Sequence, residues 1–226
     1  MILRRFTKHV TDQNWFAVWL DVIVVVVGIF LGPQVTQWND GRQDVQWERE
    51  FFQDLKGDLE RDSQHLGTVI EFQLAKGDRQ RATMQQLVSG KTLASDEFAV
   101  DYWASRSENN TFFPANGVYQ SALTPGKIEL VRDKSLRYRI MNLYGHHYTR
   151  IAYNGKIYDE RFETPAWESR KYFDSFQRQF IRWNDSVLDD IRAEFSFLIR
   201  ENEFYMGLAL TLDEKLRKRI SDLDAK

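Results

Sequence analysis

The sequence predicts an all-α protein, in which one N-terminal transmembrane helix continues into a helical stalk and an irregular helical bundle. One apolar stretch near the N-terminus is long enough to cross a bilayer. Beyond it, apolar residues recur at three- and four-residue steps, which is the period of an amphipathic helix. No stretch shows the alternation of a half-buried strand, and only four prolines and twelve glycines occur in 226 residues. These observations favour long helices over sheets.

We expect four parts along the chain. Residues 1–14 form a short basic N-terminal tail, residues 15–38 the transmembrane helix, residues 39–88 stalk helices, and residues 89–226 a helical extramembrane domain.

Composition excludes several classes of function. The chain has no cysteine, so disulfides, thiolate zinc sites and cysteine nucleophiles are excluded. Its formal net charge is -2, and no basic stripe of the kind that neutralises phosphates is present. We therefore expect no nucleic-acid partner.

The stretch from Trp15 to Pro33 predicts the membrane anchor. It holds nineteen residues, of which Asp21 is the only charged one. As a helix it would span roughly 28 Å, close to the hydrocarbon thickness of a bilayer. Trp15 and Trp19 stand at one end and Trp38 at the other, as expected for rings at the two membrane interfaces. The lipid bilayer is thus the first expected partner.

A cleaved signal peptide and a buried soluble helix are the alternatives. The basic start, Arg4, Arg5 and Lys8, suits a signal peptide, but "GPQVTQW" lacks the small-x-small cleavage pattern. Five valines between Val22 and Val27, framed by tryptophans, are unusual in a soluble core helix. We therefore favour a retained transmembrane helix.

One face of this helix predicts association in the membrane. Gly28 and Gly32 form a G-x-x-x-G pair, which lets helices approach closely. Asp21 shares a heptad position with Gly28, and a carboxylate at this depth must face protein, water or the interface. It could pair with Lys8, contact another subunit or an oligomer axis, or relay protons or ions. Gln34 could hydrogen-bond across subunits or face headgroups.

This pattern resembles a known signature. Uncharacterised bacterial membrane-anchored proteins begin with a short basic tail and a helix of the type "E-x-x-x-V-x-x-G-I-x-x-A-L-x-x-x-x-W-N". Here the matching residues are Asp21, Val25, Gly28-Ile29, Gln34 and Trp38-Asn39, with aspartate for glutamate and Leu31-Gly32-Pro33 in place of the alanine-leucine region. The stretch "VYQSALTPGKIELVRDKSLRYRIMNLY" extends the resemblance. It implies a single-pass protein with a helical domain, and no known activity.

Basic residues predict the orientation. Arg4, Arg5 and Lys8 precede the helix, while Arg42 and Arg49 follow it. By the positive-inside rule the N-terminus is cytoplasmic. With the resemblance, this predicts a bacterial inner-membrane protein whose main domain is periplasmic.

The remaining chain predicts a series of helices. The sequence predicts stalk helices over residues 43–77 and 79–88. Ser95 is predicted to be the N-cap of a further, short helix. Residues 108–117 read as a loop whose Phe112 and Phe113 are tucked under the domain.

Turn and cap signals predict the last helices. Proline and glycine within residues 123–127 suit a turn. Asp133 is expected to cap a helix running to about Phe162. Thr164-Pro165 is expected to start the next, which carries the aromatic residues up to Trp183. Two more helices, over about 186–199 and up to Leu223, complete the domain.

No catalytic motif is present in the sequence. It contains no Gly-rich phosphate loop, H-E-x-x-H pair or G-x-S-x-G elbow. His146 and His147 are adjacent, so on one helix they point about 100° apart and are poorly placed to grip one metal. We therefore expect no cofactor, no metal site and no enzymatic activity.

The favoured function is an oligomeric assembly or accessory subunit that binds itself or other membrane proteins. One alternative is a homo-oligomeric pore with Asp21 near its axis and Gln34 lining it. A second is a membrane-tethered enzyme with an unrecognised helical site.

Overall fold

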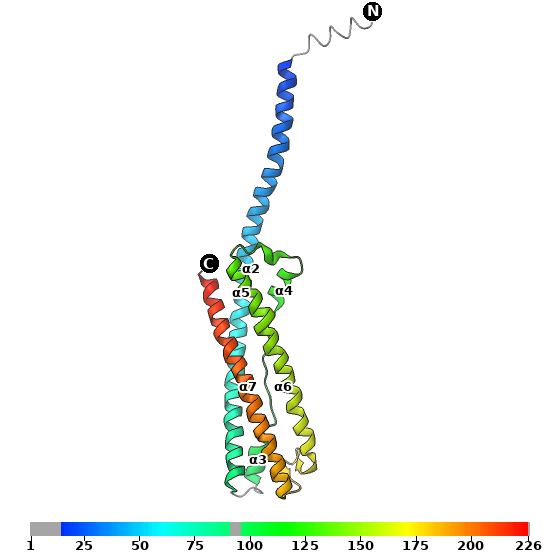
Figure 1. Ribbon diagram of the computed structural model, residues 1–226, viewed down its shortest axis with the longest axis vertical. Coiled ribbons are helices and arrows are strands. Elements are labelled where there is room, and N and C mark those ends of the chain that lie inside the picture. Colours follow the sequence, from blue (N-terminus) through cyan, green and yellow to red (C-terminus); the bar gives the residue numbers. More distant parts are fainter. Residues whose placement is uncertain (1–14, 91–95, 226) are drawn as a thin grey trace, which may run out of the picture. The chain divides into compact units, whose positions relative to one another are not determined.

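The computed structural model describes residues 15–90 and 96–225, and helices dominate it (Figure 1). The chain divides into two compact units, Met1–Glu50 and Phe51–Lys226. The expectation of an all-α fold is confirmed.

The described part of the first unit is the beginning of one long helix. Helix α2 (Trp15–Ser89) is 75 residues long, and its residues up to Glu50 belong to this unit. Most of its large apolar side chains between Trp19 and Trp38 are exposed, including Val22, Ile29 and Phe30. An apolar surface of this length is the expected outside of a helix whose surroundings are lipid or other protein.

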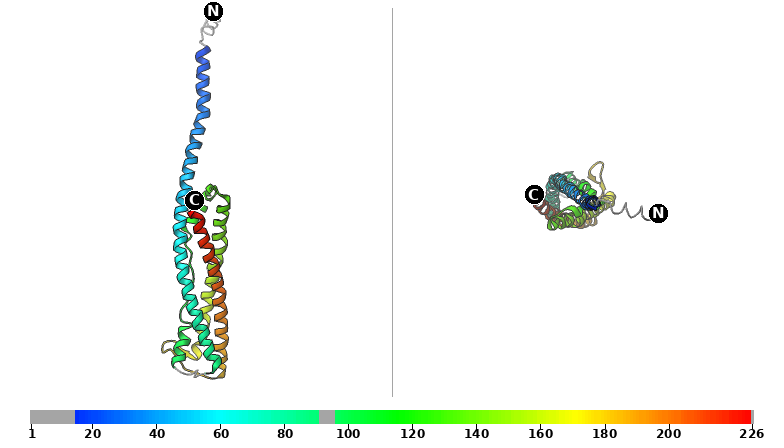
Figure 2. Two further views of the ribbon diagram at one scale, coloured as in Figure 1. Left: turned by 90° about the vertical axis from the view of Figure 1, so that its left-hand side faces the viewer. Right: turned by 90° about the horizontal axis from the view of Figure 1, so that it is seen from above.

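The second unit is a bundle of three long helical runs, shown side by side in Figures 1 and 2. The first run is α2 from Phe51 onward, so residues 51–88, assigned to the stalk above, form one side of the bundle. The second is α5 (Lys134–Asn142), the π-helix η2 (Leu143–Tyr148) and α6 (Thr149–Glu168). The third is α7 (Asp185–Asp224).

Short elements connect these runs. They are α3 (Asp96–Ala104), α4 (Gly117–Leu123), η1 (Lys127–Leu130), η3 (Ser169–Lys171) and an antiparallel hairpin of β1 (Phe173–Asp174) and β2 (Gln179–Phe180).

The helices bury continuous apolar stripes. On α7 the stripe begins with Val187, Ile191, Phe195 and Leu198, at steps of four, four and three residues. Each such side chain contributes roughly 1.5–3 kcal/mol when fully buried. Buried residues of α2 and α6 face the same interior, and the Tyr158 hydroxyl of α6 donates to the Gln73 side chain of α2.

A fourth strip of the bundle interior is not helical. Residues 108–116 form an extended segment that runs alongside α6 and α7 (Figure 1), with Thr111 and Phe112 buried. Extended backbone outside a sheet must find other hydrogen-bond partners when it is buried. Side chains of the long helices provide them: the Phe112 amide donates to the Tyr205 hydroxyl at 2.7 Å, and the Ala115 amide to Asp62 at 3.0 Å. We call residues 108–116 the threaded segment.

Several local expectations are confirmed. Asp133 caps α5, its side chain accepting from the Leu136 amide at 2.9 Å. Gly126 has φ +71°, as a turn of the Pro-Gly type requires. Phe112 is buried, but the expectation for Phe113 was wrong, because its side chain is 71 % exposed.

The expected helix break at Thr164-Pro165 was wrong, because α6 continues through both residues to Glu168. Extending an existing helix is cheaper than nucleating a new one, so a start signal inside a helix need not act. The two expected C-terminal helices are the single helix α7, which Asn184 caps by accepting from the Val187 amide.

Three of the aromatic residues expected on a new helix, Phe173, Phe176 and Phe180, lie on the hairpin instead, while Trp167 belongs to α6. Phe173 is paired with Phe180 across the two strands, while Phe176 at the tip is 96 % exposed. Asp174 orders the tip, its side chain accepting from the amides of Phe176 and Gln177. The helical spacing of these aromatics is therefore coincidental.

Replacing Gly77 with alanine should lower the free energy of unfolding by about 1–2 kcal/mol. A Cβ at Gly77 would lie 2.6 Å from Asn202 Oδ1, and Asn202 is held by bonds from its amide to the carbonyl and side-chain oxygens of Gln73. Displacing it would leave buried polar groups unpaired, which costs about 1–3 kcal/mol, against a helix-propensity gain of up to about 1 kcal/mol.

The matched control is Gly67→Ala on the same helix, where a Cβ meets nothing within 4 Å. It should raise stability by up to about 1 kcal/mol. Thermal or denaturant unfolding of both variants checks the pair, and an equal gain for both would contradict the close approach at Gly77.

Candidate functional site

The membrane-facing candidates lie on the first part of α2. One stretch of this helix is long and apolar enough to cross a membrane, with a mean hydropathy of 1.5. Trp19 and Trp38 are exposed at 62 % and 64 %, and Gln34 is also exposed. A Cβ at Gly28 would meet nothing within 4 Å, so this face is open to a neighbouring helix. The Arg42 guanidinium lies 4.9 Å from the centre of the Trp38 ring, a cation–π distance.

The other membrane candidates lie partly outside the described residues. The backbones of Trp15, Asp21 and Gly32 belong to α2, while their side-chain positions lie outside the described part. The association face and the role of Asp21 remain predictions.

The second unit holds buried polar side chains whose partners the apolar periodicity of the sequence does not predict. The buried stripe of α2 continues beyond Leu59 to Leu87 at unbroken steps of three and four residues, but five of these eight further members are polar. The sequence signal for them is their position: polar residues in register with an apolar stripe. The polar members are Asp62, Gln73, Lys76, Gln80 and Thr83.

Lys76 is the centre of the largest polar cluster. Its side chain is 1 % exposed, and its ammonium donates to Asn109 Oδ1 at 2.8 Å. Asn109 in turn donates to Asp159 Oδ1 at 2.6 Å, and Thr111 donates to the other Asp159 oxygen at 2.7 Å. Gln73 donates to the Asn110 carbonyl at 2.5 Å. The cluster thus ties the threaded segment to α2 and α6.

Burial sets the protonation of this lysine. Desolvation lowers the pKa of Lys76 to about 7, partly opposed by the negative charge of Asp159. The group therefore titrates near neutral pH, which an exposed lysine does not do.

Asp62 holds the opposite end of the threaded segment. Besides the Ala115 amide, it accepts from the Tyr148 hydroxyl at 2.6 Å. Burial raises the pKa of this carboxyl, while both hydrogen bonds lower it. The residue that interrupts the apolar pattern of α2 is therefore a hydrogen-bonding anchor within the bundle.

A buried ion pair closes the end of the bundle near α3. Arg106 Nε lies 3.1 Å from Glu194 Oε1, and the two side chains are 3 % and 7 % exposed. The Tyr102 hydroxyl donates to the other Glu194 oxygen at 3.3 Å and accepts from the Arg106 guanidinium. Burial raises the pKa of Glu194, and the positive charge of Arg106 opposes that rise. This pair joins the residues just before the threaded segment to α7.

Metal ligation gains no support from these clusters. Among the side chains that the structure describes, no group of three or more histidines, aspartates or glutamates is placed to hold a metal ion. The rings of His146 and His147 have centroids 5.0 Å apart, and Asp159 is occupied by Asn109 and Thr111.

Comparison with known proteins gives one result. No curated protein and no solved structure matches the chain. A family model matches residues 21–200, which spans both the apolar part of α2 and most of the bundle. The chain therefore belongs to DUF6090, a family of unknown function.

Proposed function

We propose that this protein is a single-pass inner-membrane protein whose helical bundle acts as an assembly or accessory module. The observation that carries the proposal is the exposed apolar surface of α2 between Trp19 and Trp38. A surface of this kind marks a contact with a membrane or another protein, because exposing a large apolar area to water is unfavourable. The tryptophans at both ends suit the headgroup layers.

The buried clusters support a structural role for the polar side chains of the bundle. Lys76, Asp62 and Asp159 each form a hydrogen bond with a residue of the threaded segment. A scaffold of this kind presents its outer faces to partners, which fits an accessory subunit better than a catalytic one. The partner is a second copy of the chain or another membrane protein.

Removing the apolar helix should release the protein from membranes. The full chain is expected to stay in the membrane fraction after alkaline carbonate washing, and a chain beginning at Gln43 should be soluble. Intact mass of the membrane-extracted protein, with Met1 or its formyl form retained, would separate an anchor from a cleaved signal peptide. A soluble full chain, or a mass lacking the first thirty or so residues, would refute the anchor.

Self-association has its own measurement. The full chain in nanodiscs is expected to be a defined oligomer, and the chain from Gln43 a monomer. Gly28→Ile should weaken the oligomer, because close helix approach needs a small residue there, whereas the matched change Val27→Ile should not. A monomeric full chain would contradict self-association and leave other membrane proteins as the partners.

Orientation can be read by cysteine labelling, because the chain has no cysteine of its own. A cysteine placed at exposed Lys156 should react with a membrane-impermeant maleimide from the periplasmic side. Labelling from the cytoplasmic side alone would reverse the proposed topology.

A further inference from the structure

A small basic pocket lies between α5, η2 and α7. Its volume is about 70 Å³, several times the roughly 10–15 Å³ that one water needs. The lining side chains include Arg139 and Asn142 of α5, His147 of η2, and Lys215 and Arg219 of α7. Four of these carry or can carry positive charge, and they come from two sides of the pocket.

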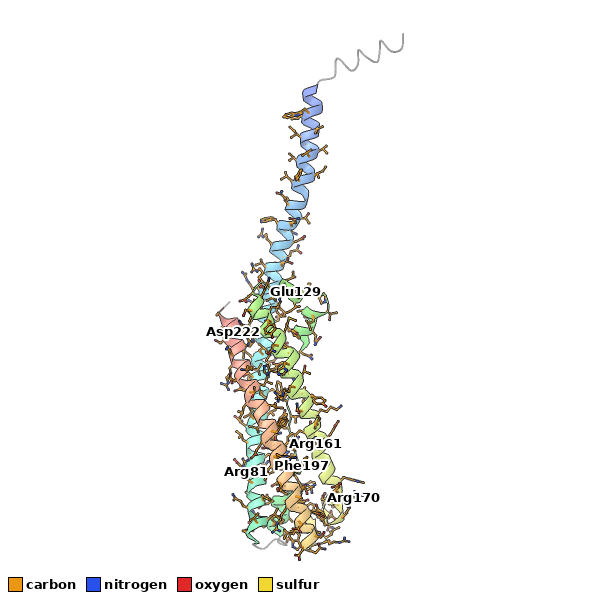
Figure 3. All side chains as sticks on the ribbon, in the orientation of Figure 1. Arg81, Glu129, Arg161, Arg170, Phe197 and Asp222 are labelled. Atoms are coloured by element: carbon orange, nitrogen blue, oxygen red, sulfur yellow. The ribbon has the colours of Figure 1, made fainter. Side chains whose placement is uncertain are left out.

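The acidic groups nearby do not balance this charge. Asp222 is shared: Arg139 Nε lies 3.3 Å from one of its oxygens, and the Arg219 guanidinium pairs with the same oxygen. It lies on the C-terminal part of α7 (Figure 3). Lys215 is paired with Glu214 at 3.3 Å, but that carboxylate is largely exposed, so the pair is screened by water.

Arg219 is built into the pocket rather than free on the surface. Its residue is 6 % exposed, and its buried Nε has no hydrogen-bond partner. A buried guanidinium N–H without an acceptor is costly, so the position favours a ligand that accepts from it.

The field around His147 agrees with this geometry. Its pKa is lowered first by burial and then by electrostatic interactions with neighbouring side chains, among them the cations Lys215, Arg150 and Arg219. This direction agrees with the cationic lining of the pocket, to which Arg139, Lys215 and Arg219 contribute.

We propose that this pocket binds a phosphate group, held by Arg139, Arg219 and Lys215 with His147 and Asn142 at its edge. Phosphate offers several acceptor oxygens and up to two negative charges, which match two guanidinium forks and one ammonium. The site concerns the bundle alone and stands whether or not the anchor proposal does.

An adjoining groove suggests how free and lipid-borne phosphate can be told apart. It has a volume of about 340 Å³, shares His147 with the pocket, and is lined mainly by apolar or small residues of α6 and α7 such as Phe204 and Leu208. A phospholipid could place its phosphate in the pocket and an acyl chain in the groove, whereas inorganic phosphate would use the pocket alone.

The test is calorimetric titration of the detergent-solubilised full chain with three probes. They are inorganic phosphate, dihexanoyl phosphatidic acid and, as the blocked-phosphate control, dihexanoyl phosphatidylcholine. Phosphate binding at millimolar or lower concentration, at constant ionic strength, is expected. Phosphatidic acid binding more than about tenfold tighter than phosphate would identify a lipid source, and equal binding a free phosphate.

Variants locate the binding. Lys215→Gln and Arg219→Gln should each weaken phosphate at least about tenfold, because each removes a charge-assisted hydrogen bond. Arg217→Gln is the matched control, since Arg217 is exposed on the same helix and paired with Asp213. Asp222→Asn should tighten binding, because it removes the competing carboxylate, and this increase is not expected of a merely structural role.

The outcomes decide the proposal. Loss of phosphate affinity in Lys215→Gln with a gain in Asp222→Asn supports the site even if Arg219→Gln does not fold. Absence of phosphate and phosphatidic acid binding, or equal binding by the Lys215 and Arg217 variants, overturns it.

Discussion

Replacing Arg106 with methionine is expected to lower the free energy of unfolding by about 3–5 kcal/mol. The change leaves Glu194 buried at 7 % exposure without its positive partner, and an unpaired buried charge costs this much. Methionine fills similar space, so lost packing contributes little. Denaturant unfolding of the full chain in detergent, monitored by circular dichroism, measures the effect.

The sign of the pH dependence identifies the cause. Burial already raises the pKa of Glu194 above its ordinary value, and removing Arg106 should raise it further. When the pKa of a carboxyl is higher in the folded than in the unfolded chain, the folded protein loses stability as the pH rises above the unfolded pKa. For Glu194 that unfolded pKa is about 4.5. The Arg106 variant should therefore lose stability relative to the parent chain as the pH rises above about 4.5. The double variant with Glu194→Leu should recover much of the loss, and a purely additive double variant would contradict the coupling.

Raising the pH from 7 to about 9.5 is expected to stabilise the bundle by roughly 2–3 kcal/mol. The pKa of Lys76 is lowered to about 7 in the folded chain from its unfolded value of 10.5. Between these values the unfolded chain binds a proton that the folded chain has released, so stability rises with pH. Each pKa unit in that window is worth about 1.36 kcal/mol.

Tyrosines set the upper limit of the window. Burial raises the pKa of Tyr158 and Tyr205 to about 12, so above pH 10 their ionisation favours the unfolded chain. Lys76→Met should abolish the rise between pH 7 and 9.5. Lys156→Met, at an exposed lysine of α6, should leave it intact. If the free energy of unfolding of Lys76→Met still rises between pH 7 and 9.5, another group must be responsible for the rise.

The sequence predicted those parts of the fold that local chemistry determines. The apolar stretch of α2, the Asp133 cap and the Pro-Gly turn each depend on neighbouring residues alone. The helical class followed from apolar periodicity, which long amphipathic helices express strongly.

Features that depend on distant contacts were not predicted. The spacing of Phe173, Phe176 and Phe180 fits a helix face as well as a four-residue hairpin loop, and only packing against Phe98 and Tyr102 of α3 selects the hairpin. The anchoring role of Asp62 could not be predicted, because its partners lie far away in sequence, at Ala115 and Tyr148.

The candidate site was predicted in the same uneven way. The positions of Trp19 and Trp38 at the two ends of the apolar stretch predict interfacial anchors, and the structure shows that both side chains are exposed. The basic pocket could not, because its arginines come from α5 and α7, eighty positions apart in the case of Arg139 and Arg219. Nothing in either helix alone distinguishes them from ordinary surface charges.

The threaded segment affects the order in which parts of the chain can fold during synthesis. Its anchors lie on α2, made before it, and on α6 and α7, made after it, with Tyr205 of α7 closing the last bond to Phe112. Contacts between residues far apart in sequence slow folding, because the entropy of closing the loop is lost before the contacts can form. We therefore expect the Phe112 amide to stay unprotected from hydrogen exchange until Tyr205 of α7 has been synthesised. Docking of α7 would then be the step that fixes the threaded segment within the bundle.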